Sequence, residues 1–230
     1  MRDNVKPVSK WEFNHEVTAC FDDMLTRSIP NYNIMREMIF NVGKNFIDDN
    51  SLIIDIGCSN GLSSERFINY CNADFELLDI SKPMLEVCRK KYENKQNVKV
   101  LFHDLRNGLH KNNVNLILSV LTLQFTPIEY RQKIVKSVYD SLKHGGCFLF
   151  VEKVLGSNEQ INSLLVNEYY SLKKQAGYSL EQVELKRKSL EGVLVPITDT
   201  WNKELLQDAG FKSVDCFWRC LNFAGYIAIK

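Results

Sequence analysis

Glycines and acids in the first half of the chain have the types and spacing of a nucleoside-binding site. Residues 51–61 read SLIIDIGCSNG, an apolar run that ends at Asp55 and leads into a turn with Gly57 and Gly61. Glycine lets the backbone turn tightly and approach a ligand closely. Ser59 stands where the NAD fingerprint has its second glycine, and no phosphate-loop motif is present. The turn therefore favours a nucleoside without a phosphate, and an ordinary α/β turn is the alternative.

Two further acids follow predicted strands. Asp79 ends the segment FELLD, about 20 residues beyond the turn, where doubly wound folds place an acid on the ribose hydroxyls. Asp104 follows VKVLF, at the sheet edge where ligands bind, and is suited to accept a hydrogen bond from an adenine amino group. A helix cap for Asp79 and a plain turn for Asp104 are the alternatives.

A parallel sheet is needed to bring these residues to one edge. Five apolar segments have the composition of buried strands: 52–54, 75–79, 98–102, 114–121 and 147–151. Helical patterns separate them, the first over 62–71, which indicates a parallel sheet with right-handed crossovers. Segments 214–220 and 223–229 are joined so tightly that they form an antiparallel hairpin. The prediction is an α/β, doubly wound, Rossmann-like fold.

Two helical segments lie outside this alternation. The first (1–48) precedes the first strand and carries Tyr32, an aromatic lid over the ligand or, equally, a surface residue. The second (154–197) follows the carboxyl end of a strand, so we expect it to cover the crevice and select the substrate. Its tyrosines are Tyr169, Tyr170 and Tyr178. Without a linker or an internal repeat, we interpret residues 1–230 as a single domain.

Composition excludes several function classes. The net charge is +1, which gives no argument for nucleic acid or an acidic membrane. No apolar run reaches transmembrane length and no signal-peptide core occurs, so the expected location is cytoplasmic. The seven cysteines lack C-x-x-C spacing, and we identify no histidine in metal-ligand spacing with any of them. We therefore expect reduced thiols and no metal site.

The order of these parts resembles the class I S-adenosylmethionine (SAM) dependent methyltransferases, which have a seven-stranded sheet with an antiparallel last strand. A closer resemblance, over nearly the whole chain, is to the carboxy-SAM synthases. It rests on these motifs: RSIPNY, DIGCSNG, LTLQF, GGCFLFVEK, AGYS, KRKSLEGV, AGF and the ending FWRCLNFAGYIAIK.

The resemblance implies a reaction other than methyl transfer. Carboxy-SAM synthases use prephenate and SAM. Prephenate loses carbon dioxide and water and gives phenylpyruvate, while the SAM methyl, deprotonated to a sulfonium ylide, captures the carbon dioxide as carboxy-SAM. A second enzyme passes the carboxymethyl group to a tRNA wobble uridine. The implied partner is thus a small molecule, prephenate or another acceptor, with no direct nucleic-acid contact, and the implied assembly is a homodimer.

The resemblance also assigns site residues. Those that hold SAM or flank its nucleoside are Tyr32, Asp55, Gly57, Cys58, Ser59, Gly61, Asp79, Ile80, Asp104 and Leu105. Arg187, in KRKSLEGV, stands where the family keeps an arginine that binds the new carboxylate, a role that suits its bidentate fork. A surface pair with Glu184 or Glu191 is the alternative for Arg187.

This chain departs from the family at three places. Val120 replaces an asparagine that contacts the cofactor, His103 replaces a glycine, and Tyr169 and Tyr170 stand where histidines are usual. Two other functions therefore remain open. One is methyl transfer to a small acceptor that enters under the tyrosines of the lid, and the other is a non-catalytic SAM-binding subunit.

Overall fold

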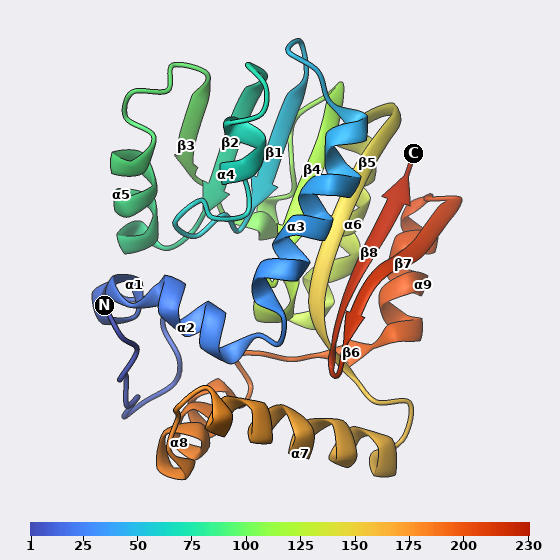
Figure 1. Ribbon diagram of the computed structural model, residues 1–230. Coiled ribbons are helices and arrows are strands. Elements are labelled where there is room, and N and C mark those ends of the chain that lie inside the picture. Colours follow the sequence, from blue (N-terminus) through green and yellow to red (C-terminus); the bar gives the residue numbers. More distant parts are fainter.

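A mixed sheet runs through the computed structural model, which describes residues 1–230, and helices cover both of its faces (Figure 1). The strand order is β3-β2-β1-β4-β5-β8-β7, and β6 pairs with the end of β5. The strands are β1 (Leu52–Ile56), β2 (Asp74–Asp79), β3 (Val98–Phe102), β4 (Val114–Val120), β5 (Leu142–Leu155), β6 (Ile197–Thr198), β7 (Ser213–Cys220) and β8 (Phe223–Ile229).

The sheet confirms the predicted topology. Strands β1 to β5 all run parallel to one another, and β8 is antiparallel to both β5 and β7. This is the doubly wound arrangement with an antiparallel last strand. The helices are α1 (His15–Ala19), α2 (Phe21–Ser28), α3 (Tyr32–Gly43), α4 (Glu65–Ile68), α5 (Lys82–Lys91), α6 (Ile128–Ser141), α7 (Glu159–Gln175), α8 (Leu180–Leu190) and α9 (Asp199–Ala209). Short 3-10 turns are η1 (Lys44–Phe46), η2 (Leu105–Asn107) and η3 (Leu123–Phe125).

Each face of the sheet carries its own apolar core. Successive strand residues point to opposite faces, so Ile53 of β1 joins the core beneath α3 while Ile54 joins the core beneath α6 and α9. Met35 and Ile39 of α3 are 0% and 1% exposed. The two cores fix the strands, and so the carboxyl ends of β1 to β5 stay at one edge.

The N-terminal segment and α7–α8 lie beyond that edge. Figure 1 shows α1 and α2 between the sheet and the α7–α8 pair. The Trp11 N–H donates to the Ser189 carbonyl at 2.9 Å, and Arg27 Nε donates to the Ala176 carbonyl at 2.7 Å. These bonds fasten the two segments to each other. No helix combines the length and the apolar character needed to cross a membrane.

Two elements differ from the prediction. The helix predicted over 62–71 is only α4, because residues 60–64 form turns and Leu62 and Ser63 face a cavity instead. Strand β5 begins at Leu142, five residues before the predicted start. The Gly145 N–H donates to the Lys230 carbonyl at 2.8 Å and the Lys230 N–H to Gly146 at 3.0 Å, which carries the ladder through the glycine pair.

Candidate active site

Two adjoining cavities open at the carboxyl edge of the sheet. The first lies between the turn after β1, helix α2 and the α7–α8 pair, and the second lies between that turn and the ends of β2 and β3. They contain about 1000 and 890 Å³ of empty space, part of it open to solvent. Their shared walls are Phe13, Gly57, Ser59, Leu121 and Phe125. One ligand can therefore extend from the second cavity into the first.

The turn after β1 presents its backbone to both cavities. The N–H groups of Gly57 and Cys58 donate to the Leu78 carbonyl at 2.7 and 2.9 Å, which ties the turn to β2. Gly57 has φ +73°, and a Cβ there would lie 2.1 Å from Thr122 Cγ2. Only glycine fits this position, because a side chain would be strained and would collide with Thr122.

Asp79 stands beside this turn, at the end of β2. Its carboxylate accepts the Ser59 N–H at 2.8 Å and the Ser81 N–H at 2.7 Å. Burial raises the pKa of Asp79, and these backbone hydrogen bonds oppose the rise. A carboxylate has about four acceptor positions. Positions therefore remain for ribose hydroxyls, as the sequence predicts.

Ile80, Asp104 and Leu105 also line the second cavity. Ile80 is 56% exposed, so it offers an apolar surface to a base. Arg106 Nε donates to both carboxylate oxygens of Asp104, at 3.0 and 2.9 Å, and this pairing lowers the pKa of Asp104. Asp104 therefore faces the cavity as a carboxylate that Arg106 already holds. His103 bonds to the Gly108 carbonyl at 2.8 Å and braces the same loop.

The structure places two of the sequence-predicted site residues behind the turn. Asp55 is 1% exposed, lines neither cavity, and accepts the Ser64 hydroxyl at 2.7 Å. Burial raises the pKa of Asp55 to about 7. Gly61 also lies outside both linings, and its carbonyl accepts the Tyr92 hydroxyl at 2.8 Å. Both residues support the turn from its buried side.

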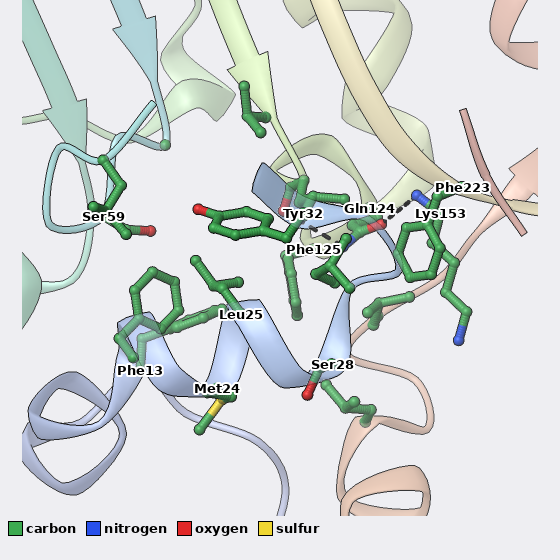
Figure 2. Close-up of a pocket in the computed structure, with 18 of the residues that line it drawn as sticks. Phe13, Met24, Leu25, Ser28, Tyr32, Ser59, Gln124, Phe125, Lys153 and Phe223 are labelled. Carbon is green, nitrogen blue, oxygen red and sulfur yellow. Dashed lines mark hydrogen bonds between the residues drawn. The ribbon is translucent and has the colours of Figure 1, made fainter. Parts of the chain in front are cut away.

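Tyr32, Cys58 and Val120 line the first cavity. Figure 2 shows the Tyr32 ring between Ser59 and Gln124, with its hydroxyl directed toward the side of Ser59. Helix α2 ends at Ser28, and α3 begins at Tyr32, which is 4% exposed at the cavity wall. The surface alternative for Tyr32 is therefore wrong.

Glu152 is a site-building residue that the sequence reasoning missed. It is 3% exposed, and its carboxyl oxygens accept the N–H groups of Thr122, Leu123 and Gln124 at 3.1, 2.9 and 2.6 Å. In return, Gln124 Oε1 accepts the Lys153 N–H at 2.8 Å (Figure 2). Burial raises the pKa of Glu152 to about 8. The motifs LTLQF and VEK thus hold each other in place through these hydrogen bonds, and we call this pair of motifs the Glu152 clamp. The sequence does not reveal it, because one motif follows β4 and the other lies in β5.

Comparisons with known proteins agree with this geometry. The family model described as "Methyltransferase domain" matches residues 53–146. A carboxy-S-adenosyl-L-methionine synthase from Nautilia profundicola is 38% identical and covers 100% of both chains. The synthase of the same name from Methylococcus capsulatus is 36% identical over 95% of this chain and 93% of its own. The chain belongs to the carboxy-SAM synthase family. The solved structure of PigF with SAH, 16% identical, has the same fold with a TM-score of 0.63 over 94% of this chain and 60% of PigF.

The three tyrosines that the sequence places in the lid are dispersed in the structure. Tyr169 is 7% exposed and lines the first cavity, whereas Tyr170 is absent from that lining and lines two smaller pockets, a third and a fourth. Tyr178 lines none of these, because its hydroxyl is bonded to Asp3 and to Ser28. Tyr169 alone among these tyrosines reaches the large cavity.

Arg187 lies outside the large cavity. Its guanidinium donates to Glu184 Oε1 and Oε2 at 2.7 and 2.9 Å and to Glu191 Oε1 at 2.5 Å, and these carboxylates raise the pKa of Arg187. This is the arrangement that the sequence alone offered as the alternative. Arg187 does line the third pocket, which shares Lys153, Tyr169 and Lys173 with the first cavity.

Lys186, the residue before Arg187, is the cation of α8 that lines the first cavity. Lys186 is 3% exposed and forms a buried ion pair with Asp3, which is 0% exposed. Burial alone would raise the pKa of Asp3, but hydrogen bonds from Lys186 and Tyr178 outweigh it and hold the pKa below its usual value. The helical spacing of Val183, Lys186 and Leu190, three and four residues apart, is the sequence signal for this inward face.

Proposed function

We propose that this chain binds SAM and prephenate and converts them to carboxy-SAM and phenylpyruvate. The observation that carries the proposal is the full-length similarity to carboxy-SAM synthases, 38% identity over 100% of both chains for one of them. The supporting geometry is the glycine turn after β1, the acid at the end of β2 and the cavity beneath α7 and α8.

In the proposed arrangement, SAM extends across both cavities. Asp79, Ile80 and Leu105 would hold the nucleoside in the second cavity, and the Gly57–Ser59 backbone and Tyr32 would hold the amino-acid end in the first. Bound SAM supplies a methyl group on a positively charged sulfur. The protein's part is to orient that methyl group and exclude water, for which the apolar wall of Phe21, Met24 and Leu25 is suited.

We also propose that Arg187 binds the new carboxylate after it exchanges its surface partners. Glu184 and Glu191 are exposed, and such pairs contribute little, because solvent screens them. Tyr169 and Lys173 line both the first cavity and the third pocket, and Arg187 lines the third pocket. A short movement of Tyr169 and Lys173 would open the route to the cavity.

Methyl transfer to a small acceptor is the second candidate. The observation that favours it is the position of Arg187, because an arginine paired with two glutamates outside the cavity holds no carboxylate within it. Catalysis would then rest on in-line positioning of the acceptor and the SAM methyl group.

Mass spectrometry of the small molecule released on denaturation separates the two functions. A SAM-like ion heavier by one carbon dioxide, with prephenate-dependent formation of the same species in an assay, supports the synthase. Plain SAM together with prephenate-independent methylation of an acceptor supports the methyltransferase.

Arg187→Leu is then expected to lose carboxy-SAM formation while it keeps SAM binding. Lys188→Leu, the next residue on α8 with 63% of its side chain exposed, is the matched control. Unchanged carboxy-SAM formation by Arg187→Leu would mean that Arg187 has no role in holding the carboxylate.

We place this activity in the cytoplasm, in one domain over residues 1–230 that acts as a homodimer and supplies a tRNA-modifying enzyme. Seven free cysteines support a reducing compartment. Exposed apolar side chains on α7 and α8 support a subunit contact: Ile161, Leu164, Leu172 and Leu180. The link to tRNA rests on the family resemblance, and sedimentation of the purified protein tests the dimer.

A further inference from the structure

The first cavity carries positive charge without an acid to balance it. Its lining includes Lys153 of β5, Lys173 of α7 and Lys186 of α8, and no aspartate or glutamate. Lys186 is paired with Asp3. Lys153 and Lys173 form no ion pair, since no carboxylate oxygen lies within 4.0 Å of either ammonium group. Two cations in the cavity wall are thus unmatched.

The two unmatched ammonium groups meet over one side chain. Lys153 Nζ lies 4.9 Å and Lys173 Nζ 5.4 Å from the centre of the Tyr169 ring. Lys173 Nζ also lies 5.3 Å from the centre of the Tyr178 ring. A ring face compensates a cation only partly. Lys153 and Lys173 also share the linings of the first cavity and the third pocket, so one anion in that space can approach both ammonium groups.

Burial makes this arrangement costly for the protein alone. Lys173 is 6% exposed. Burial lowers the pKa of Lys173 to about 7 and that of Lys153 to about 8, and the charges of Lys186 and Lys153 lower the pKa of Lys173 further. An unpaired buried charge is unfavourable unless a counter-ion joins it. A negative charge next to Lys153 and Lys173 would therefore be stabilised by both ammonium groups.

We propose that Lys153 and Lys173 form an anion subsite that binds the carboxylates of a dicarboxylate co-substrate next to the cofactor. The inference rests on the proposed function, in which prephenate supplies two carboxylates. SAM carries a net positive charge, so two lysines beside it require an anionic neighbour. A neutral or cationic methyl acceptor would leave all of these charges unbalanced.

The subsite is at the far end of the cavity from the nucleoside. Figure 2 shows Ser59 at one side and Lys153 at the opposite side, with the Lys153 side chain directed away from Gln124. Tyr169 and Lys173 belong to α7, in the lid. The co-substrate would thus enter between the lid and the end of β5 and meet the cofactor near Tyr32.

The test measures prephenate binding by titration calorimetry, with S-adenosylhomocysteine bound in place of SAM so that no reaction occurs. Lys153→Met and Lys173→Met keep the aliphatic stem and remove the charge. Each is expected to weaken prephenate binding by about tenfold or more, the loss of a charged hydrogen bond, while SAM affinity stays unchanged. Lys174→Met, the exposed neighbour of Lys173, is the control and should bind prephenate like the wild type.

Three results would overturn the subsite: unchanged prephenate affinity in both variants, an equal loss of SAM affinity, or a wild type that binds no prephenate. The unfolding midpoint of each variant, expected at or above that of the wild type, shows that the fold is kept. A wild type that binds prephenate through these lysines yet makes no carboxy-SAM refutes the proposed function and supports the subsite.

Discussion

The two halves of the site are built by different means. At the nucleoside half, backbone hydrogen bonds hold the site together: the turn at Gly57 is bonded to β2, and Asp79 accepts two backbone N–H groups. At the lid half, side chains distant in sequence hold the parts together, with Asp3 bonded to Lys186 and Arg27 to the Ala176 carbonyl. The charges differ too: Asp79, Asp104 and Arg106 line the nucleoside half, whereas the only Asp, Glu, Lys or Arg side chains that line the lid half are lysines.

This difference teaches which half is adaptable. A site made from backbone and strand ends is constrained by the sheet, and it suits a cofactor that many proteins share. A lid held by a few side-chain contacts can change its substrate with few substitutions.

Asp3→Asn should break the lid half with the largest effect. The amide keeps the shape of the carboxylate but leaves Lys186 buried without its counter-charge, which is expected to lower the free energy of unfolding by about 3–5 kcal/mol. Urea denaturation measures it. Glu181→Gln removes the exposed pair between Lys6 and Glu181 and serves as the control. Equal changes in the two variants would show that the buried pair has no special weight.

Gly57→Ala should break the nucleoside half. The new Cβ would collide with Thr122 at a positive φ, so we expect SAM affinity to fall at least about tenfold, the equivalent of about 1.4 kcal/mol. Titration calorimetry with SAM gives the measurement. Gly145→Ala is the matched control, because Gly145 has φ +76° and nothing lies within 4 Å of the added Cβ. Full SAM affinity in Gly57→Ala would mean that the turn does not set the cofactor site.

Asp55→Asn should sharpen the comparison by changing how the free energy of unfolding depends on pH. Over a single pH unit this is the smallest of the three expected effects. The pKa of Asp55 rises from 3.8 in the unfolded chain to about 7 on burial, so the folded state favours the neutral acid. Its contribution to stability is complete below about pH 4 and is lost as the pH rises through 7, by up to about 1.4 kcal/mol per pH unit. The amide has no such dependence.

Urea denaturation between pH 5 and 8 tests this, with exposed Asp208→Asn as the control. The wild type should lose stability relative to Asp55→Asn as the pH rises, and the control should follow the wild type. Parallel curves for wild type and Asp55→Asn would mean that Asp55 is charged in the folded state throughout.

The same contrast explains what the sequence could predict. Strands such as β1 and β4 and the glycine turn are local patterns, and the structure contains them at the predicted places. The pairing of Asp3 with Lys186 joins residues 183 positions apart, and a single chain offers no local signal for it. The clamp of Glu152 on Thr122 is likewise invisible, because it depends on the register of β4 against β5.

Motif similarity also cannot tell which of two adjacent helix residues faces the cavity. A motif identified KRKSLEGV, but a helix turns by about 100° per residue, so Lys186 and Arg187 point in different directions. The lid faces its cavity with Lys186 and presents Arg187 outside. Motif similarity located the segment, and only packing could tell which of its cations lies inside.

The Trp11–Ser189 bond and the Asp3–Lys186 pair have a consequence for how the protein is made. The residues that close the cavity on one side are synthesised before the residues that fasten them, which follow 178 and 183 positions later in the chain. At about 5–20 residues per second, that interval is roughly 10–40 s. During this interval Trp11 lacks its contacts with Ser189 and Lys186, so the growing chain carries exposed aromatic surface until synthesis reaches the lid.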